Sequence, residues 1–493
     1  MTVVIVMPFV LWTPHFETDL EIAQRHLDAG DRVIFLTCAA DLPICHANPL
    51  HEFAACMTCI GRRKTGLARL SGTFEELPLL NLTTADESEC RNYTFDSSTF
   101  DSITKTYVEN LDLGWGALSS LISLARDADM NLAHPFVRNL LQGFMTTSLA
   151  IYRSVRNHLR QHRIDKVYIF NTRFATSRPV FRACQAESVP CVTHDRGCDF
   201  NHYSCYENIL PHDIGPYEIA LRDAWDRADP TARESVAAKF FEDRARAVKQ
   251  SWFSFIENQR AGLLPNTWNN DVRNVAIFLS SEDEFAAIGD EWRNPLYPTQ
   301  LECLRLLATD TCNLAGIRLF VRAHPNLTGL RNTSTVALRH LRGPNLEVVL
   351  PESSISTYAM MKHCDRVISF GSTAGIEAVY WGKPSILAGV CRYRNLGATY
   401  NPQTHEELMA LLVTERLPAK ERIGALMYGY YEQTKGERFK YFEGLDVRDG
   451  LFKGHRIGPT ERYAKLATFA NDGRRAAWAN RGISAWSKRR VGL

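Results

Sequence analysis

Residues 316–326 read GIRLFVRAHPN, and residues 366–389 read RVISFGSTAGIEAVYWGKPSILAG. In each stretch an apolar run, Leu319–Val321 or Val367–Phe370, leads directly into a polar loop. Short apolar runs bounded by turn residues are typical of buried strands in a parallel sheet. Ligands in such sheets bind at the carboxyl ends of the strands, so the two loops are expected to share one crevice.

The two loops carry groups that suit the phosphate of a nucleotide. Small hydroxyls and backbone N–H groups at the start of a helix favour an anion, and the second loop offers both. Side chains of the first loop, Arg322 and His324, would add positive charge. The pattern predicts recognition of a nucleotide sugar by one set of residues: Arg322, His324, Pro325, Gly371, Ser372, Thr373, Gly375 and Glu377.

The region resembles the donor-binding half of GT-B glycosyltransferases, most closely capsule and lipopolysaccharide polysaccharide-synthesis transferases and bacterial sialyltransferases. Those families hold the nucleotide with a His-Pro motif and a Ser-Ser/Thr motif, which here match His324-Pro325 and Ser372-Thr373. Gly371–Glu377 and Gly382-Lys383-Pro384 fit the same pattern. The resemblance covers about Asp271–Thr414, and the N-terminal half shares only the strand–helix rhythm.

The resemblance implies an α/β protein with two Rossmann-like domains facing a cleft. Its implied activity is transfer of a sugar from a CMP-activated acidic sugar, or from a UDP- or GDP-sugar, to a glycan or lipid-linked acceptor in surface polysaccharide biosynthesis. No Asp-x-Asp motif stands in the right context, so no catalytic metal is expected, and whether configuration is inverted or retained stays open.

Two rival functions remain. UDP-sugar 2-epimerases share the fold, but they place a Gly-Gly pair and adjacent glutamates in the loop that here reads GSTAGIEA, where only Glu377 is present. A non-catalytic nucleotide-sugar-binding protein would keep the site without turnover. Release of free nucleotide in proportion to glycosylated acceptor distinguishes a transferase from both.

Composition narrows the class of protein and its location. The 493 residues are 45% hydrophobic and 23% charged, with a net charge of +2, which argues against a nucleic-acid binder. The apolar N-terminus lacks a basic region and a cleavage site, so Val3–Met7 is predicted to be a strand rather than part of a signal peptide. Thirteen cysteines, an odd number, favour reduced thiols, and the predicted location is cytoplasmic.

The length suggests more than one domain. Glycine, proline and asparagine cluster near 262–270, which favours a boundary there. The predicted domains are an acceptor-side domain over 1–265, a nucleotide-sugar-binding domain over 266–430, and C-terminal helices over 431–493. The first domain is expected to contain a cysteine-rich insertion over 38–66 and a helical segment over 103–160.

Candidates for the catalytic base lie in the first domain. Asp195 follows a predicted strand and precedes Arg196-Gly197, a partial match to the acidic pair before glycine in bacterial sialyltransferases. An inverting transferase needs such a carboxylate to take the proton from the acceptor hydroxyl. His15 and Glu17, after the first strand, compete for this role, and a solvated turn is the plain alternative for Asp195.

Residues near these candidates are expected to bind the acceptor. Asn171 and Arg173 end the neighbouring strand, and Arg196 follows Asp195. The two arginines suit an anionic acceptor.

A further polar loop follows the first strand of the second domain. Ser280 and Ser281 could bond a phosphate or a sugar, and Glu282 could bond sugar hydroxyls. The alternative is a helix whose first turn is capped by Ser281 and stabilised by its acids.

Four cysteines are spaced closely within one short segment. They could bind a structural zinc ion or an iron–sulfur cluster through Cys38, Cys45, Cys56 and Cys59. The alternative is that the four are free thiols that bind no metal.

The C-terminal segment 473–490 is basic and carries Trp478 and Trp486. Such a helix would lie on an anionic membrane surface, giving peripheral contact at the inner face, or would pack back on the first domain, and packing back is the favoured alternative.

Overall fold

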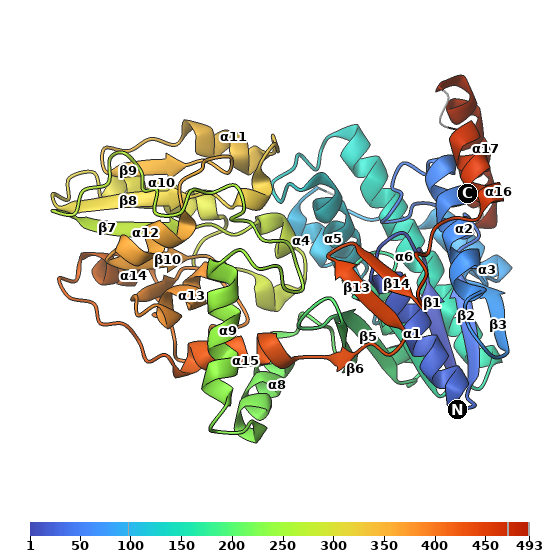
Figure 1. The fold of residues 1–493 in the computed structure, drawn as a ribbon. Helices are drawn as coiled ribbons and strands as arrows, with labels where there is room; N and C mark the ends of the chain where they lie inside the picture. The colour runs from blue at the N-terminus through green and yellow to red at the C-terminus, as the bar shows by residue number, and fades with distance from the viewer. Residues whose placement is uncertain (97, 471–472, 492–493) are drawn as a thin grey trace. The chain divides into compact units, whose positions relative to one another are not determined.

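The computed structural model describes residues 1–96, 98–470 and 473–491, and the chain divides into two compact units (Figure 1). Unit 1 comprises Met1–Ala125, Asn131–Pro211 and the chain from Lys435 onward. Unit 2 comprises His212–Thr434 and the short segment Arg126–Met130. Unit 1 is therefore assembled from three stretches of sequence.

The boundary between the units differs from the one expected near 265. Residues 212–265 belong to unit 2, because the helices α8 (Ile214–Arg227) and α9 (Arg233–Ala245) pack with α15 (Ile423–Thr434). Buried aromatic side chains such as Tyr217 and Phe241 form one cluster there. The glycine- and asparagine-rich stretch that suggested a boundary is a loop inside unit 2.

Unit 1 contains a seven-stranded sheet in the order β12-β6-β5-β4-β1-β2-β3. The five strands from β5 to β3 are parallel, and β6 and β12 are antiparallel to their neighbours. The strands span Thr2–Met7 (β1), Arg32–Thr37 (β2), Phe74–Pro78 (β3), Lys166–Phe170 (β4), Cys191–Arg196 (β5), His202–Glu207 (β6) and Glu437–Arg438 (β12). The order 3-2-1-4-5 of the parallel strands is the Rossmann order, with its switch point between β1 and β4.

Helices join and cover the strands of unit 1. They span His15–Asp28 (α1), Phe53–Leu67 (α2), Thr84–Asn92 (α3), Phe100–Thr104 (α4), Leu113–Ala125 (α5), Pro135–Gln161 (α6), Arg178–Ala186 (α7), Glu461–Phe469 (α16) and Gly473–Arg490 (α17). The segment expected to be a cysteine-rich insertion over 38–66 belongs to the crossover between β2 and β3, and α2 occupies its second half. Both C-terminal helices contact α2 in this unit.

Unit 2 contains a five-stranded parallel sheet in the order β11-β10-β7-β8-β9. The strands span Arg273–Phe278 (β7), Ile317–Arg322 (β8), Leu346–Val349 (β9), Arg366–Ser369 (β10) and Ser385–Leu387 (β11). This is again a Rossmann order, with the switch point between β7 and β10. The predicted α/β fold class is thus confirmed, and each unit holds a Rossmann-like sheet.

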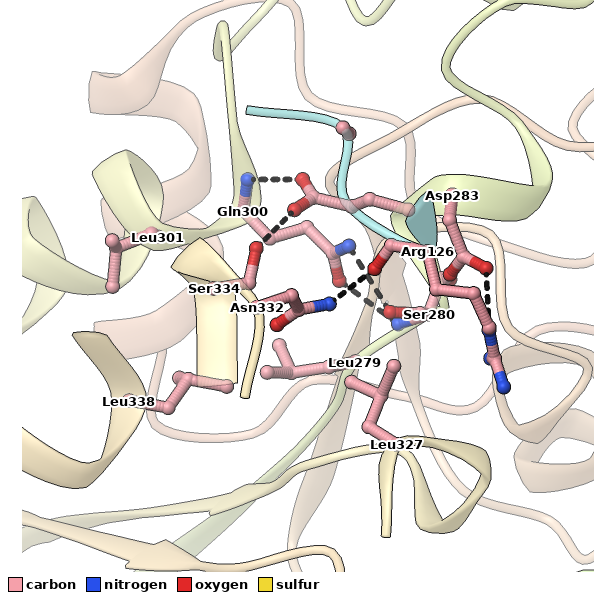
Figure 2. A pocket seen from close by; sticks show the side chains of 12 residues that line it. Arg126, Leu279, Ser280, Asp283, Gln300, Leu301, Leu327, Asn332, Ser334 and Leu338 are labelled. Carbon is pink, nitrogen blue, oxygen red and sulfur yellow. Dashed lines mark hydrogen bonds and ion pairs between the residues drawn. The ribbon is translucent and has the colours of Figure 1, made fainter. Parts of the chain in front are cut away.

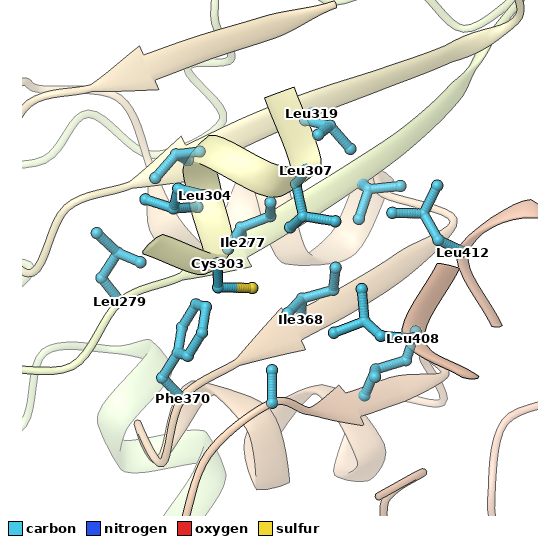
Figure 3. Packing of buried hydrophobic residues seen from close by; sticks show 14 of the residues in the cluster. Ile277, Leu279, Cys303, Leu304, Leu307, Leu319, Ile368, Phe370, Leu408 and Leu412 are labelled. Atoms are coloured by element: carbon cyan, nitrogen blue, oxygen red, sulfur yellow. The ribbon is translucent and has the colours of Figure 1, made fainter. Parts of the chain in front are cut away.

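The central strands of unit 2 are apolar because helices cover both faces of the sheet. Ile277 and Ile368 contribute to a core that also takes Leu304 and Leu307 from α10 (Gln300–Asp310) (Figure 3). The other helices are α11 (Thr333–His340), α12 (Thr357–His363), α13 (Ala374–Tyr380) and α14 (His405–Val413). Among the described residues, no helix is both long enough and apolar enough to cross a bilayer.

Candidate functional site

In unit 2, the loops that follow β10, β7 and β8 lie at one edge of the sheet. These three strands are parallel neighbours, so their carboxyl ends meet there. The loops contain Gly371–Gly375, Ser280–Glu284 and Ala323–Leu327. The predicted donor residues are therefore brought to the switch point, where ligands of this fold bind.

The loop after β10 depends on its two glycines. Gly371 has a φ of +113°, and a Cβ there would lie 2.6 Å from the carbonyl oxygen of Val390. A Cβ on Gly375 would collide with the hydroxyl groups of Ser369 and Tyr393. Side chains at either position would displace the loop, so both glycines fix its path.

The hydroxyl residues of this loop are partly engaged. The Ser372 Oγ accepts a hydrogen bond from the N–H of Ala374 at 3.3 Å, and its carbonyl accepts one from Tyr393 at 2.6 Å. The Thr373 Oγ1 accepts one from the Arg244 guanidinium at 2.9 Å. The loop therefore holds an arginine beside the start of α13.

Arg244, which the sequence analysis did not single out, also pairs with the buried Glu377. Its Nε lies 3.1 Å from the Glu377 Oε1, and the Tyr358 hydroxyl donates to Oε2 of the same carboxylate. The guanidinium side chain keeps 33% of its surface exposed. Arg244 thus brings a cation to the loop where the sequence analysis placed a phosphate.

His324 begins the short 3₁₀ helix η3 (Pro325–Leu327), and its Nδ1 accepts the N–H of Asn326 at 3.1 Å. Burial lowers the pKa of His324 to about 4, with smaller effects from the charges of Asp283 and Arg244 among others. The ring is therefore neutral at pH 7, and because Nδ1 accepts, Nε2 carries the proton. In this structure His324 is a neutral N–H donor and does not carry the positive charge that the sequence suggested.

Arg322 does not serve the role expected from the sequence either. It is 2% exposed, and its guanidinium donates to the carbonyl groups of Leu350 at 2.6 Å and Ser353 at 3.2 Å. It ties β8 to the loop after β9. Burial lowers the pKa of Arg322 to about 10, which still leaves it charged at pH 7.

The loop after β7 lines a pocket with residues of the segment Arg126–Met130 (Figure 2). Ser280 bonds Gln300 through its backbone N–H at 2.9 Å and its carbonyl at 3.3 Å, and its buried Oγ has no partner among the described residues. Glu282 accepts the N–H of Gln300 at 2.9 Å. Burial raises the pKa of Glu282. The pocket thus offers a free hydroxyl and a carboxyl group.

Ser281 does not cap a helix, since its hydroxyl donates to Asp283 at 2.7 Å and only a 3₁₀ turn (Glu282–Glu284) follows. That alternative for the loop is wrong, because the chain makes a single turn before it leaves the sheet edge.

Arg126, also missed in the sequence, links the loops after β7 and β8. Its guanidinium lies 3.0 Å from the Asp283 carboxylate, 3.3 Å from the Ser281 hydroxyl and 3.3 Å from the carbonyl of Asn326. Its backbone carbonyl accepts from the Asn332 side chain. Two arginines therefore reach the predicted donor loops from parts of the chain far away in sequence.

In unit 1, a pocket lies at the switch point between β1 and β4. Its lining includes Trp12, His15, Asp19 and Phe170. The His15 ring lies against the Phe170 ring, with centroids 3.8 Å apart. Burial lowers the pKa of His15 well below its ordinary value, and the charges of Arg196 and His194 add to the effect. His15 is therefore a neutral imidazole in this pocket.

Asp195 lies at the end of β5, next to the loop after β4. Its carboxylate accepts from the Asn171 side chain at 2.8 Å and from the backbone N–H of Arg196 at 2.8 Å. Asn171 and Thr172 have positive φ values of 62° and 57°. Left-handed backbone costs energy in residues other than glycine and concentrates at functional sites. The structure thus brings two predicted site residues, Asp195 and Asn171, into direct contact.

Glu17 is 2% exposed and pairs with Arg62 of α2, and the Thr13 hydroxyl donates to it at 3.3 Å. Burial raises the pKa of Glu17. Its second oxygen has no partner among the described residues. This carboxylate is occupied by Arg62 and does not line the pocket that holds His15.

The sequence did not reveal a buried histidine–aspartate pair, His194 and Asp19. Asp19 lines the same pocket as His15. The His194 Nε2 and the Asp19 Oδ1 are 2.8 Å apart, and the His194 side chain is fully buried. Burial raises the pKa of Asp19 against the opposing effect of His194. The two residues are 175 positions apart, and no local pattern links them.

The two arginines expected to bind an acceptor differ in their surroundings. The Arg196 guanidinium donates to the carbonyls of Thr13 at 3.1 Å and Val447 at 2.7 Å, and burial lowers its pKa to about 10. Arg173 lies over the ring of Phe174 at 4.8 Å. Arg196 therefore organises the loop after β1, and Arg173 is the arginine placed at the end of β4.

The four cysteines singled out in segment 38–59 lie near one another in unit 1. Burial raises the pKa of Cys38, Cys45, Cys56 and Cys59, and the neighbouring thiols raise that of Cys45 further. Within the described residues, no three of them bring their sulfur atoms within 4.8 Å of one another. The metal site at these cysteines stays a prediction.

The comparisons with known proteins bear on the C-terminal part of the chain. Residues 298–432 match the family of capsule polysaccharide biosynthesis proteins. The resemblance predicted for this region is thereby confirmed for the capsule family. No curated protein matches the chain.

The solved structures that match this chain have low sequence identity to it. A KpsC beta Kdo 2,4 transferase of Thermosulfurimonas dismutans is 12% identical, covering 62% of this chain and 87% of that one, with a TM-score of 0.35. The calicheamicin glycosyltransferase CalG4 is 11% identical over 99% and 98% of the two chains, with a TM-score of 0.26. A UDP-GlcNAc 2-epimerase from Neisseria meningitidis is 10% identical over 95% and 98%, with a TM-score of 0.22. Likeness at this level says nothing further about activity.

Proposed function

We propose that this protein is a glycosyltransferase of capsule polysaccharide biosynthesis that uses a nucleotide-sugar donor. The observation that carries the proposal is the meeting of three loops at the switch point of unit 2. Two of them, the loops after β8 and β10, lie within residues 298–432, which match the capsule family. Unit 2 binds the donor, a CMP-activated acidic sugar or a UDP- or GDP-sugar, and unit 1 binds a glycan or lipid-linked acceptor.

The chemistry available in unit 2 suits a leaving phosphate. Arg126 and Arg244 supply positive charge, and His324 supplies a neutral N–H donor. Fixed donors and cations can stabilise a developing phosphate charge without a metal ion. The pocket around Ser280 and Glu282 offers a hydroxyl and a carboxyl group to the nucleoside or the sugar.

In unit 1, the acceptor hydroxyl is deprotonated by Asp195, with His15 as the competing base. Asp195 is held by Asn171 and the backbone of Arg196, and His15 is neutral at pH 7. Either group can take a proton from an attacking hydroxyl. Glu17 is the weakest of the three candidates, because Arg62 already occupies it.

The donor is identified by thermal unfolding with a panel of CMP-, UDP-, GDP- and dTDP-sugars. A ligand that binds the native state raises its stability. The reaction is then followed with the stabilising donor and a panel of glycan and lipid-linked acceptors. Nucleotide released in step with glycosylated acceptor supports a transferase. Epimerised donor supports the isomerase instead, and binding without turnover across the panel supports a non-catalytic protein.

We expect His324→Ala to weaken donor binding by roughly 1.5–3 kcal/mol, the scale of a hydrogen bond to a charged group. This corresponds to about a 10- to 150-fold rise in Kd, measured by calorimetric titration with the donor that stabilises the protein. His324→Gln is the matched control, because its amide N–H can replace the Nε2 donor and should recover part of the affinity. Equal affinity in the wild type and His324→Ala would remove the residue from the donor site.

We also propose peripheral contact of α17 with an anionic membrane. Ala479, Ile483 and Ser487 form its buried stripe, and the Asn480 side chain accepts from the N–H of Phe53 in α2 at 2.7 Å. Packing on unit 1 and contact with a membrane, which the sequence posed as alternatives, are therefore compatible. The exposed residues of the helix include Trp478 and Trp486 and six cations: Arg474, Arg475, Arg481, Lys488, Arg489 and Arg490.

Binding to vesicles tests this contact. We expect co-sedimentation with phosphatidylglycerol-containing vesicles that weakens with salt, since each basic residue near an anionic surface contributes about 1 kcal/mol. The double variant Trp478→Ala and Trp486→Ala should bind several-fold more weakly. Trp381→Ala, which removes a tryptophan of similar exposure from unit 2, is the control. Equal binding to purely zwitterionic vesicles would contradict an electrostatic contact.

A further inference from the structure

The turn between β5 and β6 gathers three different metal-binding side chains. The ligand atoms of Cys198, Asp199 and His202 all lie within 4.8 Å of one another. In the part of the chain that the structure describes, no other group of three or more histidine, cysteine or acidic side chains gathers this closely. The group lies three residues beyond Asp195, outside the residues assigned to donor or acceptor.

The backbone holds this turn from both sides. β5 and β6 pair up to Arg196 and Tyr203, and the N–H of Gly197 donates to the carbonyl of His202 at 2.9 Å. The N–H of Cys198 donates to the carbonyl of Lys435 at 3.0 Å. The ligands therefore sit on a closed loop whose ends are fixed by the sheet.

The hairpin of β13 (Phe442–Asp446) and β14 (Asp449–Phe452) closes on the same turn. The N–H of Gly444 donates to the Asn201 side chain at 3.0 Å, and a Cβ on Gly444 would collide with the carbonyl of Phe200. A preformed loop of this kind loses little entropy when it binds an ion.

The set of ligands selects the metal. A thiolate, an imidazole and a carboxylate are the three ligand types of zinc, and three protein ligands leave a fourth, tetrahedral position for water. The His202 Nδ1 and the Asp199 Oδ1 are 2.6 Å apart, so these two ligand atoms already converge. Calcium and magnesium take oxygen ligands and are disfavoured by the sulfur and nitrogen.

We propose that Cys198, Asp199 and His202 form a zinc site that pins the β5–β6 turn. Zinc binds cysteine as a thiolate, so binding would release the thiol proton and strengthen as pH rises. The site goes beyond glycosyl transfer, and its role is to hold the strand that carries Asp195.

Cobalt(II) titration of the full chain, purified without a metal-affinity tag, tests the site. Cobalt bound to a thiolate gives a charge-transfer absorption in the near ultraviolet, which reports a sulfur ligand directly. We expect this band in the wild type, its loss in Cys198→Ser, and a large loss of affinity in His202→Asn. Cys205→Ser is the matched control, because Cys205 is an exposed thiol on β6 outside the group.

A second variant separates this site from the four cysteines near α2. We expect zinc to raise the Tm of the wild type, because a ligand that binds the native state stabilises it. Cys56→Ser removes one of those thiols and should leave both the cobalt–thiolate band and this rise in Tm unchanged. Far-ultraviolet circular dichroism and the metal-free Tm check that Cys198→Ser still folds. The proposal is overturned if no thiolate band forms, if the band survives in folded Cys198→Ser, or if it is lost in Cys56→Ser instead.

Discussion

Replacing Asp195 with asparagine is expected to lower kcat by a factor on the order of 10²–10⁴ while donor affinity is nearly kept. A general base acts on the acceptor in the transition state, and an amide has the shape of the carboxylate without its basicity. Steady-state kinetics with the identified donor and acceptor, together with donor titration, measure the two quantities separately.

The structure also defines the controls for this experiment. Both carboxylate oxygens of Asp195 accept N–H donors, from Asn171 and from Arg196, and an amide can satisfy only one of them. Asp195→Asn therefore costs about 1–3 kcal/mol of stability, and activity is measured well below its Tm. Asn171→Gly tolerates the positive φ and keeps the base. Because Asn171 is itself an expected acceptor residue, its loss should raise KM for the acceptor more than it lowers kcat.

The competing bases decide the mechanism. If Asp195→Asn stays active while His15→Ala loses turnover, the base is the neutral imidazole in the pocket after β1. Glu17→Gln should lower stability more than activity, because it weakens a buried pair with Arg62. Full activity in all three variants would exclude this acid–base chemistry and favour a retaining mechanism, in which the donor phosphate helps to deprotonate the acceptor.

We expect Arg178→Met to lower the free energy of unfolding by about 3–5 kcal/mol, because it removes a partner from a buried carboxylate. Asp112, at the start of α5, contacts Arg178 and Arg182 of α7, and the Asp112 and Arg178 side chains are 5% and 4% exposed. Chemical denaturation at pH 7 measures the loss. Arg160→Met is the control: it removes a 54% exposed partner of Glu187 and should cost less than about 1 kcal/mol.

The lowered pKa of Asp112 determines how the stabilisation by Arg178 changes with pH. Burial alone would raise the pKa of Asp112, but the charges and hydrogen bonds of Arg178 and Arg182 outweigh it and hold the pKa below the ordinary value. The stabilisation is thus fully present above the unfolded-state pKa of about 3.9 and is lost as pH falls through the lower folded value. The difference in the free energy of unfolding between wild type and Arg178→Met should therefore become smaller below about pH 4. A constant difference down to pH 2 would contradict this origin.

Local sequence patterns were sufficient for the sheet of unit 2 and for its loops. Apolar runs such as Val367–Phe370 become buried strands because helices cover both faces, and the glycines after β10 mark a path that a side chain would block. The partners of those loops were not predictable. Arg126 and Arg244 reach them from 129 to 200 residues away in sequence, and no periodicity records a contact at that distance.

The charge and the partners of the residues after β8 could not be predicted from the sequence either. His324 and Arg322 looked alike as cations after one strand, but burial and an accepted N–H make the first a neutral donor, and two carbonyls engage the second. The boundary between the units was missed for a related reason. Residues 212–265 join unit 2 because α8 and α9 pack against the distant helix α15, and composition along the sequence does not record that contact.

The three-part origin of unit 1 sets an order of events during synthesis. Phe439, Phe442, Phe452 and Ile457 pack in the same core as Val3 and Ile5, although more than 430 residues separate them. The strands β1 and β2 must therefore wait for residues that are synthesised about 400 positions later, whereas residues 212–434 of unit 2 emerge as one stretch. Contacts so distant in sequence slow folding and leave apolar surface open in the meantime. During synthesis the sheet of unit 1 is thus the part that depends most on chaperones. Loss of residues 439–457 would destabilise this sheet first.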